Sequence, residues 1–199
     1  MTIPSKREQT HQRILEVAAR ALRRNGFGGV GVADVMKGAG LTHGGFYAHF
    51  DSREALLVEA LEHADAASTA NLERRVAALR EQGASPLAAL VTAYLSEEHL
   101  SAHETGLGCV VAALGSEMAH QEATLREVAR SRIERLVAHV EAALAEEGRT
   151  DAAGQALVLA GAMVGALQIA RTFGPDAQGS AMLAASRKAL LAQHARQPA

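Results

Sequence analysis

The sequence predicts an all-α protein of about nine helices, and three observations support this fold class. The 199 residues are 48% hydrophobic but only 3% aromatic, and alanine dominates the apolar content, a mixture that favours closely packed helices over a β-sandwich. Only four prolines interrupt the chain. Apolar residues recur with helical spacing through most of it, which predicts amphipathic helices rather than strands.

Three helices are expected in the first 50 residues. The first runs from about Lys6 to Asn25, where apolar positions follow helical spacing and Gly26 acts as a stop signal. A second, short helix follows Gly31 and ends at the Gly38-Ala39-Gly40 corner, where glycine adopts a left-handed conformation at little cost. Thr42 can cap the third helix.

Six further helices are expected in the remainder of the chain, and no internal repeat relates them. Turn and capping residues separate them, for example Ser85 as a cap with Pro86 in the first helical position. The predicted ends of each helix are accurate to within about two to four residues. The expected ranges are 52–79, 86–103, 109–118, 121–147, 151–173 and 177–193.

The composition favours an intracellular protein. Cys109 is the single cysteine, so an intrachain disulfide is impossible and a secreted disulfide scaffold is not expected. The polar, basic N-terminus lacks the apolar segment of a signal peptide. The most apolar stretch, Ala156 to Ala170, is too short to span a bilayer, so no membrane association is expected. The sequence therefore predicts a cytoplasmic protein.

The charge of the chain is unevenly distributed. Residues 1–53 carry eight Lys or Arg and four Asp or Glu, a net charge of +4, whereas residues 54–199 carry a net charge of −6. Phosphate neutralisation depends on local charge, so the basic end is the candidate for nucleic-acid binding. A solvated basic helix is the alternative, because charge alone does not distinguish the two.

The segment from Gly31 to Phe50, GVADVMKGAGLTHGGFYAHF, has the pattern of a helix-turn-helix unit. Two short helices meet at a glycine corner, and the second presents Thr42, His43, Tyr47 and His49. Such units dock on DNA through the second helix, which enters the major groove. The segment therefore predicts groove binding rather than catalysis.

The N-terminal region also resembles the signature of the TetR family of transcriptional regulators. The matching positions are Gly26-Phe27, Val35, Ala39-Gly40-Leu41-Thr42, Gly44, Phe46-Tyr47, His49-Phe50, Ser52-Arg53-Glu54 and Leu56-Leu57. The resemblance implies a DNA-binding head over residues 8–68 and an effector-binding and dimerisation domain over residues 69–199. It also implies a homodimer, formed through the last two helices, that represses from double-stranded DNA until a small-molecule inducer releases it.

Eight residues form the expected DNA-binding set: Lys37, Thr42, His43, Gly44, Gly45, Tyr47, His49 and Arg53. In similar proteins the positions of Thr42, Tyr47 and His49 contact phosphates, which sets the register on DNA rather than the sequence that is read. Arg53 matches a position that usually holds a lysine facing the DNA backbone. Ordinary surface exposure is the alternative for these residues.

His43 and the two glycines beside it are the expected base readers, since they lie at the N-terminal end of the recognition helix. Adjacent glycines weaken a helix by about 1 kcal/mol each relative to alanine, and their benefit is close approach of the backbone to DNA. Alternatively, one glycine only makes room for a neighbour. Met36 stands where the family usually has alanine, and its larger side chain must be accommodated against the recognition helix.

The last two expected helices are rich in small residues, from Gly154 to Ala166 and again from Ala181 to Ala185. Such faces let helices approach closely, which favours a four-helix interface between two subunits over packing within one chain. A dimer also fits the head, because two recognition helices read two half-sites.

Five residues are the expected lining of an effector pocket in the C-terminal domain: Tyr94, Cys109, Met118, Met163 and Gln168. They are polar or pliable groups in otherwise apolar helices, as are His139 and Arg171, and such groups suit a ligand cavity. The alternative for each is a place in the core or in an interface.

Cys109 supports a second functional hypothesis. It follows Gly106-Leu107-Gly108 and begins a helix, where amide dipoles favour a thiolate. The segment also resembles a cysteine-bearing segment of a TetR subgroup in which some members sense electrophiles or oxidants. A thiol-based sensing repressor is therefore one alternative, and a small buried apolar cysteine is the other.

Neither an enzyme nor a metal protein is expected. His99 and His103 have the spacing of a metal-binding pair, but the sequence places no further ligands, so no metal and no cofactor is predicted. A phosphate loop and a nucleophile elbow are absent from the sequence. The remote alternatives to a DNA-binding regulator are a helical enzyme and an interaction scaffold that uses the acidic C-terminal helices.

Overall fold

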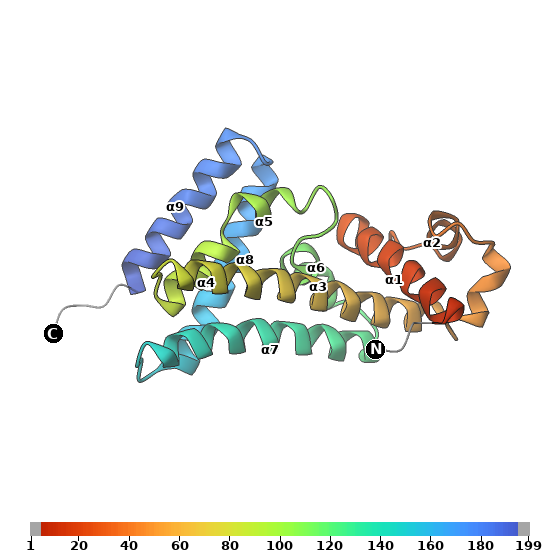
Figure 1. Ribbon diagram of the computed structural model, residues 1–199, viewed down its shortest axis with the longest axis horizontal. Coiled ribbons are helices and arrows are strands. Elements are labelled where there is room, and N and C mark those ends of the chain that lie inside the picture. The colour runs from red at the N-terminus through yellow and green to blue at the C-terminus, as the bar shows by residue number, and fades with distance from the viewer. Residues whose placement is uncertain (1–4, 195–199) are drawn as a thin grey trace.

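The computed structural model describes residues 5–194, and this part of the chain forms nine α-helices and one short 3-10 helix, with no strand (Figure 1). The predicted all-α fold is confirmed. Buried side chains from the N-terminal head and from the larger C-terminal body belong to one continuous hydrophobic core.

Helix α1 (Lys6–Asn25) begins and ends at the signals that its sequence carries. Ser5 and Glu8 form a capping box, in which Glu8 N–H donates to Ser5 Oγ at 3.2 Å and Ser5 N–H donates to Glu8 Oε2 at 2.6 Å. Gly26, with φ of 72°, ends the helix as predicted. The buried face of α1 packs on helix α3 (Arg53–Glu81).

The helix-turn-helix region is formed by α2 (Val32–Gly38) and by η1 (His43–Ala48), which is a 3-10 helix. An α-helix was expected at η1. Gly44 and Gly45 explain the difference, since two adjacent glycines disfavour the α-helix and leave a short, tighter turn. The Thr42 side chain makes no capping hydrogen bond, so this expected cap is also wrong.

Helix α3 connects the head to the body. It begins after Ser52, whose Oγ accepts a hydrogen bond of 3.0 Å from Ala55 N–H, and it continues without a break for 29 residues. Residues 68 and 69, where the sequence placed the domain boundary, lie within this helix. Its first half packs against α1 and its second half belongs to the body.

Six more α-helices complete the described part of the chain. They are α4 (Pro86–Tyr94), α5 (Glu97–Ser101), α6 (Val110–Met118), α7 (Ala123–Glu146), α8 (Ala152–Phe173) and α9 (Ala177–His194). The single helix expected over 86–103 is instead two helices. Ser96 caps α5 by accepting a hydrogen bond from His99 N–H at 3.3 Å, and the Arg187 guanidinium holds the Leu95 carbonyl at 3.1 Å. These tertiary and capping bonds stabilise the break.

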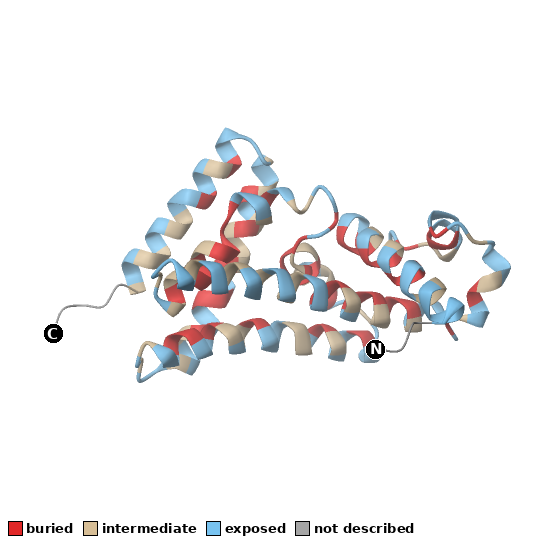
Figure 2. Ribbon diagram, in the orientation of Figure 1, coloured by how far each residue is buried: buried red, intermediate tan, exposed pale blue. Residues whose placement is uncertain are grey.

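The body is built around α3 and α7, which lie side by side along its length, with α8 crossing behind them and α9 at the far end from the head (Figure 1). Buried residues face inward along these helices, whereas α9 is mostly exposed or half-buried (Figure 2).

Helix α8 has 22 residues and, by length and composition alone, is long and apolar enough to cross a membrane. The expectation that the apolar stretch in this region is too short to span a bilayer was therefore wrong. The helix packs against α6, α7 and α9, and buried residues such as Met163 and Leu167 contribute to the common core. Only 28% of its most apolar window is buried, which leaves an apolar face uncovered.

Candidate DNA-binding surface and effector cavity

The η1 segment has one buried and one exposed side. Phe46 and Phe50 are each 2% exposed and stack with ring centroids 5.7 Å apart, which anchors the segment to the head. Tyr47, next to Phe46 in the chain, is 72% exposed. Thr42, His43 and Gly44 are also exposed, so most of the expected DNA-contacting residues share this outer surface.

The packing of the head does not explain the two glycines of η1. A Cβ atom added at Gly44 would meet nothing within 4 Å. One added at Gly45 would lie 3.6 Å from Met36 Cε, an ordinary van der Waals distance. Met36 is itself fully buried beneath η1, at 1% exposure. The methionine is thus accommodated without requiring a glycine.

Residues of α1 hold the end of η1. Arg7 Nη2 donates to the Ala48 carbonyl at 2.9 Å, and the His11 ring stacks on Phe50 at 4.5 Å while bonding Glu59 at 2.7 Å. His49 is half-buried, and its Nδ1 has no hydrogen-bond partner among the described residues. Burial, together with the charges of His11 and Arg7, lowers the pKa of His49. The role of Arg7 could not be predicted from the sequence, because its partner lies 41 positions away.

Arg53 is exposed, but its guanidinium is engaged within the chain. Its Nε donates to the Val30 carbonyl at 3.0 Å and its Nη2 to the Phe27 carbonyl at 2.5 Å. Arg53 therefore stabilises the connection between α1 and α2 by binding two of its backbone carbonyls. Lys37, on α2, is exposed and makes no such bond.

Two side chains join the head to the body. Glu117 of α6 accepts a hydrogen bond from Phe27 N–H at 2.9 Å. Arg23 of α1 donates to the Gly106 carbonyl at 2.9 Å and also to the Ala64 carbonyl of α3. Burial lowers the pKa of Arg23 to about 10.

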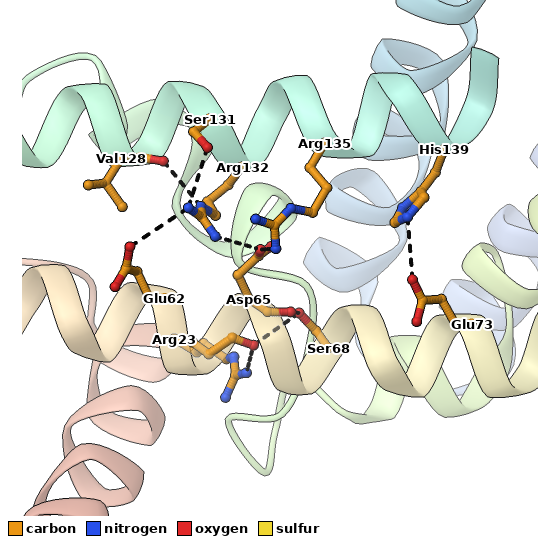
Figure 3. A network of polar contacts seen from close by, with 11 residues as sticks. Arg23, Glu62, Asp65, Ser68, Glu73, Val128, Ser131, Arg132, Arg135 and His139 are labelled. Carbon is orange, nitrogen blue, oxygen red and sulfur yellow. Dashed lines mark hydrogen bonds and ion pairs between the residues drawn. The ribbon is translucent and has the colours of Figure 1, made fainter. Parts of the chain in front are cut away.

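A buried carboxylate lies between the two long helices of the body. Asp65 of α3 points toward α7, where its Oδ2 accepts from Arg132 Nη1 at 3.2 Å and from Arg135 Nη1 at 3.0 Å (Figure 3). Along the same helices, His139 faces Glu73 at 3.5 Å. These contacts connect α3 and α7 through polar groups.

A small cavity of about 30 Å³ lies beside this carboxylate, with room for about one water molecule. Tyr94, His99, Cys109, Asp65 and the two arginines are among its lining residues. The Tyr94 hydroxyl donates to Cys109 Sγ at 3.5 Å, and burial raises the pKa of Tyr94 well above its ordinary value.

His99 is fixed in one tautomer by two backbone partners. Its Nδ1–H donates to the Tyr94 carbonyl at 2.7 Å, and its Nε2 accepts from Cys109 N–H at 3.1 Å. Burial lowers the pKa of His99 to about 4, so the ring is neutral at pH 7. Sequence spacing singled out His99 as a possible metal ligand. The part of the chain that the structure describes contains no group of three or more residues suited to hold a metal.

Of the five expected effector residues, the structure brings Tyr94 and Cys109 together at the cavity. Met118 and Met163 are buried in the core, at 3% and 0% exposure. Gln168 donates to the Ala112 carbonyl at 3.2 Å and lines a separate groove between α6, α7 and α8.

Arg171 is half-buried, and its charged end is enclosed by the protein near Cys109. All three of its guanidinium nitrogens are inaccessible and lack a hydrogen-bond partner in the described chain. A Cβ atom at Gly108 would lie 2.5 Å from Arg171 Nη2, so the guanidinium is seated against this glycine. Burial lowers the pKa of Arg171, while nearby Cys109 and Tyr94 act in the opposite direction.

A larger cleft of about 630 Å³ opens between α3, α4 and α7. Its apolar lining consists mainly of Val76, Ala77, Pro86, Leu90, Ala142 and Ala143. At its rim Arg80 forms an ion pair with Glu146. Leu72 and His139 line both this cleft and the inner cavity, so the two are adjacent.

An uncovered apolar face lies on α8 and α9. Leu157 and Val158 are 65% and 73% exposed, and Ile169 and Phe173 continue the surface along α8. Met182 extends it onto α9. Exposed apolar surface of this extent is typical of an interface between protein molecules.

Comparison with known proteins agrees with this geometry. Residues 14–60 match the family described as bacterial regulatory proteins, tetR family. No curated protein sequence matches the chain.

Solved structures show the same fold over nearly the whole chain. The TetR-family transcriptional regulator from Agrobacterium tumefaciens is 23% identical, with 94% of this chain and 98% of that chain covered and a TM-score of 0.77. The reduced form of E. coli NemR is 24% identical, with 92% and 95% covered and a TM-score of 0.74. Regulatory protein TetR from Rhodobacter sphaeroides is 21% identical, with 91% and 96% covered and a TM-score of 0.75.

Proposed function

We propose that this chain belongs to the tetR family of bacterial regulatory proteins and is a cytoplasmic repressor that binds a palindromic operator as a homodimer and is released by a small molecule. The observation that carries the proposal is the η1 surface. An exposed Tyr47 and an exposed Thr42-His43-Gly44 segment stand on a buried aromatic anchor, in the part of the chain that matches the family.

In the proposed complex η1 enters the major groove. His43 reads a base edge, and Gly44 and Gly45 let the backbone approach, since no intrachain contact requires a glycine at either position. Thr42, Tyr47 and His49 contact phosphates, with Lys37 nearby on α2. Arg53 contributes by holding the α1–α2 connection, and its charge adds to the phosphate-facing surface.

The proposed dimer forms through α8 and α9, which places two heads on two half-sites. Its support is the exposed apolar face with Leu157 and Val158 near its start. Gly161 and Gly165 lie on the same helix, and a Cβ atom at either would meet nothing within 4 Å. A partner helix could therefore approach α8 closely.

The proposed effector site lies between α3 and α7, where Tyr94 and Cys109 meet the polar cavity. Helix α6 starts beside this cavity, immediately after Cys109, and carries Glu117 against the head. A ligand that moves α6 or α3 would change the position of the head, and thus the separation of the two heads on DNA.

Selection of bound fragments from genomic DNA tests the DNA-binding function. We expect recovery of palindromic sites, bound at nanomolar concentration with an affinity that falls steeply as salt rises. Recovery of random fragments with no shared site would reject a sequence-specific repressor.

A thiol-based sensing repressor is the second candidate, and the observation that favours it is Arg171. The Tyr94 hydroxyl donates to Cys109 Sγ, and the unpaired Arg171 guanidinium lies against the neighbouring Gly108. Reactive cysteines lie in electropositive, partly exposed settings of this kind. The test is release of the protein from its operator by N-ethylmaleimide. Equal release of wild type and Cys109→Ser would eliminate this function.

A further inference from the structure

The inner cavity and the outer cleft form one path from solvent to the interior. Leu72 of α3 and His139 of α7 line both spaces. The outer part is wide and mainly apolar, whereas the inner part is narrow and lined by charged groups. A molecule that fills both needs an apolar body and a polar head.

The inner end carries more positive than negative charge. Arg132 and Arg135 share the single carboxylate of Asp65, whose side chain is 8% exposed. Glu62 is the next carboxylate, 3.9 Å from Arg132, but it is half exposed and lies at the surface. Two guanidinium groups thus compete for one buried acceptor.

Two further arginines lie near the inner cavity, although neither lines it. Arg23 is 4% exposed, and its Nε has no partner in the described chain, while its other nitrogens bond backbone carbonyls. Burial lowers the pKa of Arg23, and the nearby carboxylate of Asp65 acts in the opposite direction. Arg171 has no hydrogen-bond partner at all among the described residues. Buried cations without a counter-charge are costly, so an anion would stabilise this region.

The outer cleft is lined by three carboxylates, Glu73, Glu81 and Glu146, and by one arginine, Arg80. Arg80 pairs with Glu146, and His139 pairs with Glu73. The rim therefore disfavours an anionic group, whereas the rest of its lining is mainly aliphatic and suits an apolar chain. A negatively charged group is therefore favoured only at the inner cavity, beside Arg132 and Arg135.

From this arrangement we propose that the cleft binds an elongated carboxylic acid, with its apolar chain along the α3–α7 cleft and its carboxylate on Arg135 and Arg132. The role of this acid as an inducer rests on the proposed repressor function, but its binding does not. Arginine suits a carboxylate because its planar fork donates two parallel hydrogen bonds.

Binding of this acid requires movement, because the inner cavity holds only about one water molecule. Arg135 is 43% exposed and can turn toward an incoming carboxylate, which then competes with Asp65. In addition, α3 and α7 must move apart at Leu72 and His139, so that the ligand can pass from the outer cleft to the inner cavity. Asp65 follows Ala64, whose carbonyl accepts a hydrogen bond from Arg23 of the head. A movement of α3 at Asp65 would therefore be transmitted to α1 through this hydrogen bond.

Calorimetric titration of the purified full-length protein tests the proposal with three probes of equal chain length: decanoate and decylammonium below their micelle concentrations, and decan-1-ol below its solubility limit. We expect decanoate to bind at least about tenfold more tightly than either of the others, since only it supplies the missing negative charge. Equal or tighter binding of the alcohol or the ammonium would overturn the proposal.

Arg135→Gln is the diagnostic variant, and Arg130→Gln is its matched control on the same helix. Arg130 is exposed and pairs with Glu127 and Glu134 along α7, away from the cleft. We expect Arg135→Gln to weaken decanoate binding about tenfold and leave decanol binding unchanged, with Arg135→Lys intermediate. Decanoate affinity that is the same in Arg135→Gln and Arg130→Gln, both folded by circular dichroism, would also overturn it.

Operator binding with and without decanoate separates the two ideas. If decanoate binding depends on Arg135 but decanoate does not lower operator affinity, the carboxylate site is supported and release of the protein from its operator by such an acid is rejected. Specific operator binding by a protein that does not prefer decanoate rejects the carboxylate site and leaves the repressor function standing.

Discussion

The carboxylate of Glu117, near the end of α6, accepts a hydrogen bond of 2.9 Å from the backbone N–H of Phe27 in the head. The carbonyl of the same Phe27 accepts from Arg53 at 2.5 Å. Phe27 is thus held from the body on one side and from the start of α3 on the other. The α1–α2 connection depends on both contacts.

Glu117→Ala should loosen this connection. The variant leaves the partly buried Phe27 N–H without its acceptor, and we expect the free energy of unfolding to fall by about 1 to 2 kcal/mol. Urea unfolding followed by circular dichroism measures the change. Glu141→Ala, on an exposed position of α7, is the control and should stay within about 0.5 kcal/mol of wild type. A Glu117 variant as stable as this control would mean that the hydrogen bond contributes nothing.

Asp65→Asn should be more damaging. The amide keeps the volume but removes the charge that Arg132 and Arg135 share, so two guanidinium groups lose their counter-charge. We expect a loss of about 3 kcal/mol in the free energy of unfolding. Glu134→Gln, which removes one partner of the exposed Arg130, should cost under about 0.5 kcal/mol. Similar losses in the two variants would show that the Asp65 network is no stronger than a surface ion pair.

Two adjacent aromatic residues in η1 should separate folding from DNA binding. Phe46→Ala removes a side chain that is 2% exposed and should cost about 3 to 4 kcal/mol of stability. Tyr47→Phe removes only an exposed hydroxyl, so the melting temperature should be unchanged while operator affinity falls about fivefold to tenfold. Thermal melting and operator titration of both variants provide the comparison. Unchanged operator affinity in Tyr47→Phe would exclude a phosphate contact by this hydroxyl.

Local signals in the sequence predicted most of the helices. Ser85 caps α4 and Gly26 ends α1 as expected, because each of these effects acts over a few residues. The break after Tyr94 is harder to predict, since only the Ser96 cap is local and the other contact comes from Arg187, 92 positions away from Leu95. The spacing of His99 suggested a metal ligand, but its role comes from two backbone partners that only the folded chain supplies. Long-range polar contacts therefore mark the limit of the sequence prediction.

The exposed face of α8 offers a test of the proposed dimer. Val158 is 73% exposed, so Val158→Glu should not disturb the fold of one subunit. In a dimer it would bury a carboxylate without a partner, and we expect dissociation to monomers with at least about a hundredfold loss of operator affinity. Sedimentation measures the oligomeric state, and Ala138→Glu on the exposed side of α7 is the control. A Val158 variant that remains dimeric would place the interface elsewhere.

The stability of the protein should fall in mild acid because of His99. Burial lowers the pKa of this ring from 6.5 to about 4, so between these values the unfolded chain takes up a proton that the folded chain does not. The free energy of unfolding therefore falls as pH falls through this window, by about 2 kcal/mol between pH 7 and pH 5 from His99. Burial also lowers the pKa of His49 and of His103, which adds to the slope with the same sign.

Urea unfolding of His99→Gln at pH 7 and pH 5 isolates the contribution of His99. The variant should be less stable than wild type at pH 7, because glutamine does not reproduce both bonds to the Tyr94 carbonyl and the Cys109 N–H. Its loss between pH 7 and pH 5 should be smaller than that of wild type by about 2 kcal/mol. His120→Gln, at an exposed position, should keep the wild-type pH dependence. If His99→Gln keeps it too, the His99 ring must already be protonated or exposed in the folded protein near pH 5.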